Sequence, residues 1–168
     1  MPPLAPTPDA GRLPVHALLD NVRSAWNVGS MFRTADAAGL GGLYLAGMTA
    51  TPPRPDLEKT ALGATRSVPW DYWQDPVAAV RHVQAAGLRV VALEQTDRAV
   101  DWLECDYEFP LCFVVGHEVK GVGPGVLALA DTVVEIPMAG AKDSLNVAVS
   151  FGLLAFELRR RWRREGRG

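Results

Sequence analysis

The chain has 168 residues, 48% of them hydrophobic and 21% charged, and its formal net charge is −2. These values fit one globular domain with a full hydrophobic core, and the lack of any apolar run of about 18 residues excludes a membrane-spanning helix. The proline-rich start has no apolar core behind a basic region, so we expect no secretory signal.

In chain order, the hydrophobic pattern and the capping residues predict alternating strands and helices. The predicted elements are a strand over 15–19, a helix from Asn27 to about Ala38 ended by Gly39, a strand over 43–46, a turn over 51–55, a short helix over 56–62, a helix from Asp75 and Pro76 to Gly87, strands over 88–93 and 111–115, a short helix over 125–130, a strand over 132–136, and a final helix from Ser144 to about Arg163. The strand over 111–115 is apolar throughout, as is typical of a parallel strand covered on both faces. The sequence therefore predicts an α/β fold with a mainly parallel sheet flanked by helices.

The cysteines and histidines do not form a metal-binding pattern. Cys105 and Cys112 have no paired histidine spacing, and His16, His82 and His117 lie in unrelated segments. We therefore expect two reduced thiols in a cytoplasmic protein and no bound metal.

The charge is concentrated at the C-terminus. Residues 159–168 carry six arginines and one glutamate, a net charge of +5, so the remaining residues sum to −7. A basic tail on an acidic body suits contact with phosphates, but it also suits the solvated end of a helix, whose macrodipole favours positive charge there. Both interpretations stay open on the charge pattern alone.

The first candidate site segment runs from Asn21 to Arg33, between a predicted strand and a predicted helix. Ligand sites of α/β proteins lie at such places, and a helix N-terminus offers free N–H groups to an anion. Arg33 lies about one and a half turns into the predicted helix and is suited to contact a phosphate. The alternative is structural, with Asn27 capping the helix and Arg33 solvated.

The second segment, 114–123, follows the most apolar strand. Gly116 lets the backbone approach a ligand closely, and Glu118 stands at the carboxyl end of the strand, where open sheets place functional groups. A plain turn with a solvated Glu118 is the alternative. A dinucleotide-binding loop is disfavoured, because Val126 takes the place of the third glycine and Pro124 interrupts the turn.

The third segment joins Glu135-Ile136-Pro137-Met138 to Ser144-Leu145-Asn146. A strand that ends in this way supplies an apolar shelf, with carbonyls that Pro137 helps to free from the sheet, and such a shelf suits an adenine ring or a thioether. Ser144 also resembles a plain N-cap.

In order and spacing, the three segments resemble motifs 1, 2 and 3 of the SpoU/TrmH branch of the SPOUT RNA methyltransferases. The matching residues are Asn27, Gly29, Arg33, Ala35 and Gly39 in the first, Gly116, Glu118 and Gly121 running on to 136–138 in the second, and 144–147 with Glu157 in the third. Each motif alone is weakly specific, but three in order are much more so, and the resemblance covers about residues 14–160.

The resemblance implies an α/β fold with a deep trefoil knot near the C-terminus, a rare exception to unknotted topology. It implies S-adenosylmethionine as cofactor, transfer of its methyl group to a ribose 2′-hydroxyl of tRNA or rRNA, and a homodimer with the active site near the subunit interface. The expected organisation is a disordered or extended lead-in at 1–13, the methyltransferase domain at 14–160 and a basic tail at 161–168.

The resemblance also assigns residues. Arg33 would be the catalytic residue that engages the 2′-hydroxyl and its neighbouring phosphate. The other residues expected at the reacting region are Asn27, Glu118, Ser144 and Asn146, and those expected to line the cofactor pocket are Leu93, Gly116, Ile136, Met138 and Leu145.

Two other functions compete with this one. A non-catalytic RNA-binding protein that keeps the fold is disfavoured by the intact Arg33, Glu118, Ser144 and Asn146. A Rossmann-type small-molecule methyltransferase would need an early glycine-rich loop and an acidic ribose ligand, which the sequence lacks. We expect no separate N-terminal RNA-binding domain, so the arginine tail becomes a candidate for RNA contact.

Overall fold

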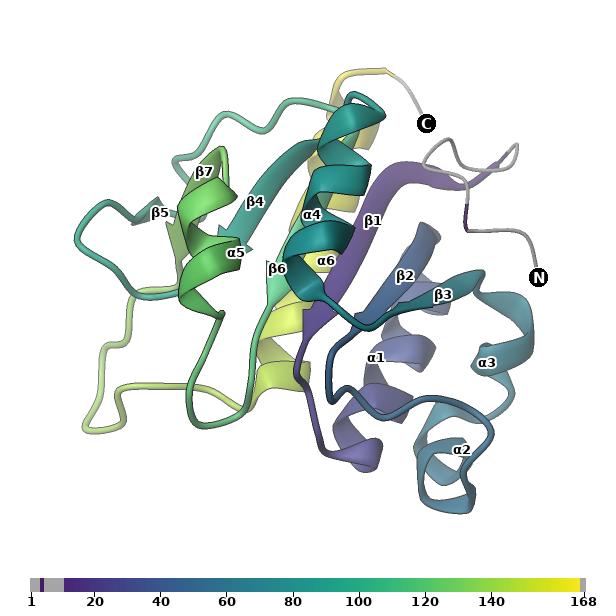
Figure 1. The fold of residues 1–168 in the computed structure, drawn as a ribbon. Coiled ribbons are helices and arrows are strands. Elements are labelled where there is room, and N and C mark those ends of the chain that lie inside the picture. Colours follow the sequence, from purple (N-terminus) through teal and green to yellow (C-terminus); the bar gives the residue numbers. More distant parts are fainter. Residues whose placement is uncertain (1–3, 5–10, 167–168) are drawn as a thin grey trace.

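The computed structural model describes Leu4 and residues 11–166, and it shows a twisted sheet between two layers of helices (Figure 1). The strands are β1 (Leu13–Asp20), β2 (Leu40–Ala46), β3 (Trp70–Trp73), β4 (Arg89–Leu93), β5 (Val100–Asp101), β6 (Leu111–Val115) and β7 (Thr132–Glu135). The helices are α1 (Ala25–Ala38), α2 (Pro55–Ala61), α3 (Ala64–Ser67), α4 (Pro76–Ala85), α5 (Pro124–Leu129) and α6 (Val147–Arg164). Most of the predicted lead-in at 1–13 lies outside the described residues, as do residues 167 and 168 of the predicted tail.

The seven strands follow the order β3-β2-β1-β6-β4-β7-β5, and the ladders between the described strands are parallel. The predicted mainly parallel sheet is therefore confirmed. Because the strands run the same way, their carboxyl ends meet at one edge, where open α/β sheets bind ligands. The loops after β1, β4, β6 and β7 all leave from this edge.

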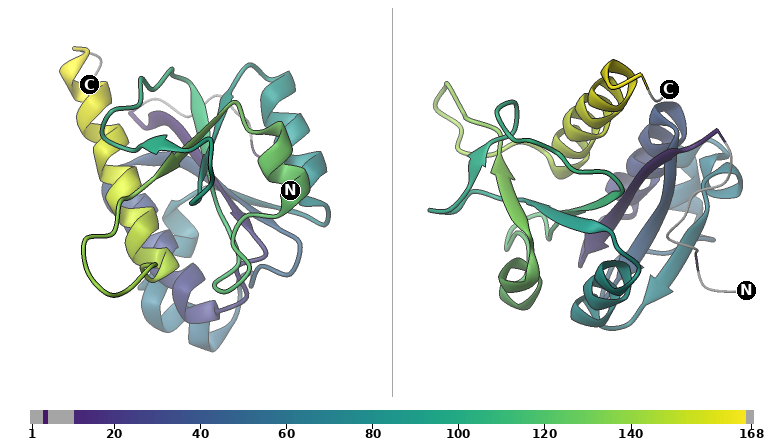
Figure 2. Two further views of the ribbon diagram at one scale, coloured as in Figure 1. Left: turned by 90° about the vertical axis from the view of Figure 1, so that its left-hand side faces the viewer. Right: turned by 90° about the horizontal axis from the view of Figure 1, so that it is seen from above.

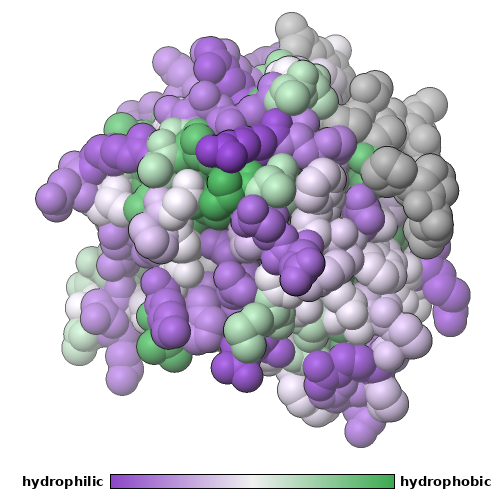
Figure 3. All heavy atoms as spheres, viewed as in Figure 1, coloured by the Kyte–Doolittle hydropathy of each residue, from purple (hydrophilic) through white to green (hydrophobic). Residues whose placement is uncertain are grey.

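Each face of the sheet has its own hydrophobic core. Residues of α1, α2, α3 and α6, such as Phe32 and Phe151, pack with Leu19 of β1 on one face, while Val80 of α4 and Val126 of α5 pack on the other. The two helix layers lie on opposite sides of the sheet when it is viewed from above (Figure 2). The face that carries α4 and α5 is mostly hydrophilic, with apolar atoms visible between these two helices (Figure 3).

Two of the predicted helix starts are wrong. Helix α1 begins at Ala25, and its N-cap is Ser24, whose hydroxyl accepts a hydrogen bond from the backbone N–H of Asn27 at 3.3 Å. Helix α6 begins at Val147, and its N-cap is Asn146 instead of Ser144, since the Asn146 side chain accepts from the N–H of Ala148 at 2.8 Å. In both places several polar residues compete for the cap, and the backbone that precedes the helix decides among them. The side chains of Asn27 and Ser144 are therefore not committed to capping.

Other boundaries follow the sequence. Gly39 ends α1 in the left-handed conformation, with φ 75°, and Asp75 caps α4 by accepting from the N–H of Val77. The sequence does not predict α3, β3 or β5. Strand β3 is an edge strand with partly exposed side chains, and β5 has two residues, so neither carries a strong hydrophobic alternation.

Candidate active site

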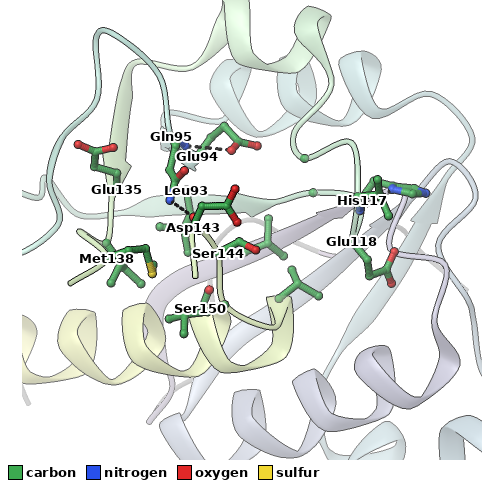
Figure 4. A pocket seen from close by; sticks show the side chains of 17 residues that line it. Leu93, Glu94, Gln95, His117, Glu118, Glu135, Met138, Asp143, Ser144 and Ser150 are labelled. Atoms are coloured by element: carbon green, nitrogen blue, oxygen red, sulfur yellow. Dashed lines mark hydrogen bonds between the residues drawn. The ribbon is translucent and has the colours of Figure 1, made fainter. Parts of the chain in front are cut away.

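A cavity of about 350 Å³ opens at the carboxyl edge of β4, β6 and β7, within the size range of small-molecule sites (Figure 4). Its walls come from three stretches that are distant in sequence: 93–95, 115–121 and 135–150. Seven of the ten residues named from the sequence line it, namely Leu93, Gly116, Glu118, Ile136, Met138, Ser144 and Leu145. Asn27, Arg33 and Asn146 do not line it.

Gly116 is required by the chain's own backbone. A Cβ added there would lie 2.2 Å from Gly121 C and from Val122 N. The loop from His117 to Gly121 closes on itself through two backbone hydrogen bonds, of 3.0 and 2.9 Å, between those residues. The sequence predicted a close approach of Gly116 to a ligand, but the atoms that a Cβ there would meet are those of Gly121 and Val122, so this close approach within the chain shapes the wall of the cavity.

Glu118 joins the loop after β6 to the start of α1. Its carboxylate accepts from the backbone N–H of Ser24 at 2.9 Å and from that of Arg23 at 3.3 Å. Burial opposes ionisation of Glu118, but the hydrogen bonds from Ser24, its own N–H, Arg23 and the Asn27 side chain outweigh burial and lower its pKa. Glu118 is therefore an ionised carboxylate at neutral pH that fixes the first segment against the second.

Asn27 and Asn146 connect the first segment to the third. The Asn146 side-chain amide donates to the Asn27 side-chain oxygen at 3.3 Å, across 119 residues of sequence. Because Asn27 also contacts Glu118, a continuous polar contact runs from Glu118 through Asn27 to Asn146. All three motif segments therefore meet beside the cavity, and a substrate group there would face two side-chain amides and a carboxylate.

Arg33 lies apart from this cluster. It is exposed on α1, and within the described part of the chain its side chain makes no hydrogen bond or ion pair. Six residues of α-helix turn the chain by about 600°, so Arg33 projects about 120° away from Asn27 around the helix axis. Arg33 therefore lies on a different face of α1 from Asn27, and it does not line the cavity of its own chain.

Four polar residues of the cavity were not identified from the sequence: Glu94, Gln95, Asp143 and Ser150. Glu94 and Gln95 directly follow β4, a position that could have indicated them, since it is equivalent to that of Glu118 after β6. With Glu118 and Glu135, the cavity has four carboxylates, and neither Lys nor Arg is among the described residues that line it. Such a lining favours a ligand that carries positive charge.

The described arginines at the C-terminal end divide into those with side-chain partners and those without, and Arg159 belongs to the first group because it donates to the Ala38 carbonyl at 3.3 Å. Arg160 and Arg161 bind the buried carboxylate of Glu157 at 2.6 and 2.8 Å, and Arg161 also donates to the Cys105 carbonyl at 2.8 Å. Arg163 and Arg164 are exposed and make no side-chain hydrogen bond or ion pair within the described residues. Four of the arginines, 159, 160, 163 and 164, line a shallow surface depression with Phe156.

No group of three or more His, Cys, Asp or Glu side chains in the described part of the chain is placed to hold a metal ion. No helix within residues 11–166 is both long and apolar enough to span a membrane.

In a comparison with known proteins, residues 14–156 match the model of the SpoU rRNA Methylase family. The chain is 33% identical over 151 residues to the tRNA (guanosine(18)-2′-O)-methyltransferase of Escherichia coli strain K12, covering 88% of this chain and 64% of that enzyme. The chain thus spans less than two thirds of the length of this relative.

Solved structures support the same family. The AdoMet-bound rRNA methyltransferase from Sinorhizobium meliloti superposes with a TM-score of 0.85 at 34% identity, covering 95% of this chain and 60% of that one. A structure described in connection with 2-OH methylation of C/U34 on tRNA superposes with a TM-score of 0.78 at 28% identity, covering 89% of this chain and 96% of that one. The family match over most of the chain, together with these relatives, establishes that the chain belongs to the SpoU methylase family.

Proposed function

We propose that the protein transfers a methyl group from S-adenosylmethionine to a ribose 2′-hydroxyl of tRNA or rRNA. One observation carries the proposal: segments around residues 27, 118 and 146 converge beside a cavity whose lining includes the apolar residues expected to hold the cofactor. The relatives are named as tRNA and rRNA methyltransferases, and one of the similar structures is AdoMet-bound, which supports the same reaction and cofactor.

The cavity lining fits S-adenosylmethionine. Leu93, Ile136, Met138 and Leu145 form apolar walls suited to an adenine ring. The carboxylates of the lining suit the cationic amino and sulfonium groups. When bound, the cofactor would supply a methyl group already activated by the positive charge on sulfur.

The chain's own residues then have to position and polarise the ribose hydroxyl, which is a poor nucleophile while it keeps its proton. Arginine stays protonated in proteins, so we assign Arg33 to hold the hydroxyl and its neighbouring phosphate and to stabilise charge, with a phosphate oxygen as the proton acceptor. Glu118, Asn27, Ser144 and Asn146 hold the loops around the reacting region.

We propose a homodimer in which Arg33 of one protomer serves the cavity of its partner. Helix α6 exposes Val149, Leu153 and Phe156, which are 51%, 40% and 46% exposed and recur at the i, i+4, i+7 spacing of one helix face. Helix α1, which carries the exposed Arg33, packs against α6. Pairing of two copies through this surface would cover the apolar face and bring Arg33 to a second chain.

Subunit mixing tests this arrangement. Arg33→Ala and Gly116→Ala each inactivate a different half of the site, so random mixing should restore about a quarter of the wild-type activity through heterodimers that hold one intact site. A mixture as inactive as its parents, with dimers confirmed by ultracentrifugation, would contradict the shared site.

We also propose that the chain forms the deep C-terminal trefoil knot that its resemblance to the SpoU/TrmH branch implies. The support is that the stretch between β7 and α6 lies against the loops after β4 and β6 and shares the cavity with both. For RNA contact, we propose the uncommitted Arg163 and Arg164 rather than the whole basic tail, because Arg160 and Arg161 are bound to Glu157.

The decisive experiment is mass spectrometry of ribose-methylated nucleosides in total tRNA and rRNA from cells with and without the gene. Loss of one 2′-O-methylated nucleoside is expected, and it would identify the RNA class. The competing function, an RNA-binding protein without catalysis, predicts an unchanged profile and no S-adenosylmethionine binding by calorimetry.

A further inference from the structure

Residues 139–146, here named the closing segment, form one wall of the cavity with little support from burial. Every residue of the segment is exposed, and it has no regular secondary structure before α6. Two hydrogen bonds join the described closing segment to the chain outside α6: Asn146 to Asn27 at 3.3 Å, and the Gln95 side-chain amide to the Asp143 carbonyl at 2.7 Å. The position of the segment over the cavity therefore depends on few contacts.

Gln95 reaches the closing segment from the end of β4. The preceding residue, Glu94, reaches the loop after β6, which forms the opposite wall of the cavity. The carboxylate of Glu94 accepts from the backbone N–H of Gln95 and from that of Val122, both at 2.9 Å. Its oxygen packs on Gly121, where an added Cβ would lie 2.0 Å away. Figure 4 shows Glu94, Gln95 and Asp143 in this arrangement beside the cavity.

We propose that Glu94 and Gln95 form a brace that couples the loop after β6 to the closing segment, and that Gln95 is a positioning residue for the cofactor site. The inference rests on the proposed function for the identity of the ligand, but the brace itself is a property of the chain. Gln95 acts through the main chain of Asp143, and through it on Ser144 and Leu145, which line the cavity.

The brace is tested first without cofactor, by limited trypsin digestion of the full chain. Lys142 lies in the closing segment and is exposed, and cleavage after it requires the segment to detach. The loss of one well-placed hydrogen bond should speed cleavage after Lys142 about fivefold in Gln95→Ala. The matched control is Gln84→Ala, because the Gln84 amide donates to a backbone carbonyl, that of Leu129, at 2.8 Å, far from the cavity in the packing of α4 on α5.

The second measurement is the affinity for S-adenosylhomocysteine by calorimetry. Gln95→Ala should bind S-adenosylhomocysteine about fivefold more weakly than the wild type does. Gln84→Ala should bind it with the wild-type affinity. Gln95→Glu has nearly the same shape but cannot donate to the Asp143 carbonyl while ionised. Its affinity relative to Gln95→Ala should rise as the pH falls toward about 4.3, where a glutamate becomes protonated and can donate.

These outcomes test the brace and the proposed cofactor separately. Wild-type cleavage after Lys142 in both Gln95→Ala and Gln95→Glu would overturn the brace, and so would unchanged ligand affinity in both. If the wild-type protein itself fails to bind S-adenosylhomocysteine, the proposed cofactor is wrong, while the cleavage rates still decide on the brace. Gln95 is exposed, so both variants should stay folded, and urea unfolding should show a loss of stability no larger than that of one hydrogen bond, about 1 kcal/mol.

Discussion

Gly116→Ala should disable the cofactor site while leaving the rest of the fold intact. The new Cβ would lie 2.2 Å from Gly121 C and Val122 N, whereas ordinary contact begins at 3.4 Å, so the backbone has to move by about 1.2 Å. Such a shift disturbs the hydrogen bonds that close the loop and the one from Val122 to Glu94. Misplacement of positioned groups by about 1 Å costs on the order of 100-fold in rate.

The assay is methyl transfer from labelled S-adenosylmethionine to RNA, with calorimetric binding of S-adenosylhomocysteine and urea unfolding beside it. Gly152→Ala is the control, because the Cβ there meets Thr34 Cγ2 at 3.5 Å, an ordinary contact, and lies inside α6. The control should keep its ligand affinity and gain up to about 1 kcal/mol of stability. Gly116→Ala with wild-type affinity and rate would refute the close-approach argument.

Four further results are expected. Arg33→Lys should lose roughly 100-fold in turnover with unchanged cofactor affinity, because the planar donor is lost, and near-normal turnover would remove Arg33 from its role. Arg161→Ala should lower the free energy of unfolding by about 1–3 kcal/mol, because its partners Glu157 and Cys105 lose a donor. Arg163→Ala should keep that stability but reduce the salt slope of RNA binding by about 0.7–0.9 per lost phosphate contact, and an unchanged slope would exclude this contact. The hydrogen bond from Arg160, together with that from Arg161, lowers the pKa of Glu157 below its ordinary value of 4.5 despite burial. The stability from this cluster should therefore be fully present above about pH 4.5 and be lost as the pH falls through the lowered pKa. Urea midpoints of the wild type, measured from pH 7 to 3, should fall more steeply than those of Glu157→Gln. Equal slopes for the two proteins would contradict this expectation.

Short-range patterns predicted the parts of the fold that depend on local chemistry. The apolar run over 111–115 matches β6 residue for residue, and Gly39 and Asp75 end and begin helices where expected. These features rest on burial, backbone freedom and capping, which are properties of a few neighbouring residues. The helix starts near Asn27 and Ser144 were misjudged because several capping residues stand close together there.

In the site, too, some features were predictable from the sequence and others depend on the folded chain. The sequence by itself determined the family and named seven residues that line the cavity, because the order and spacing of three motifs constrain both. Only the tertiary structure decided that Gly116 accommodates the chain's own backbone, that Arg161 supports Glu157, and that Gln95 holds the carbonyl of Asp143. These contacts join residues brought together by the parallel sheet and by packing. Hydrogen bonds between groups tens of residues apart leave no periodic trace in the sequence, so the folded chain alone reveals them.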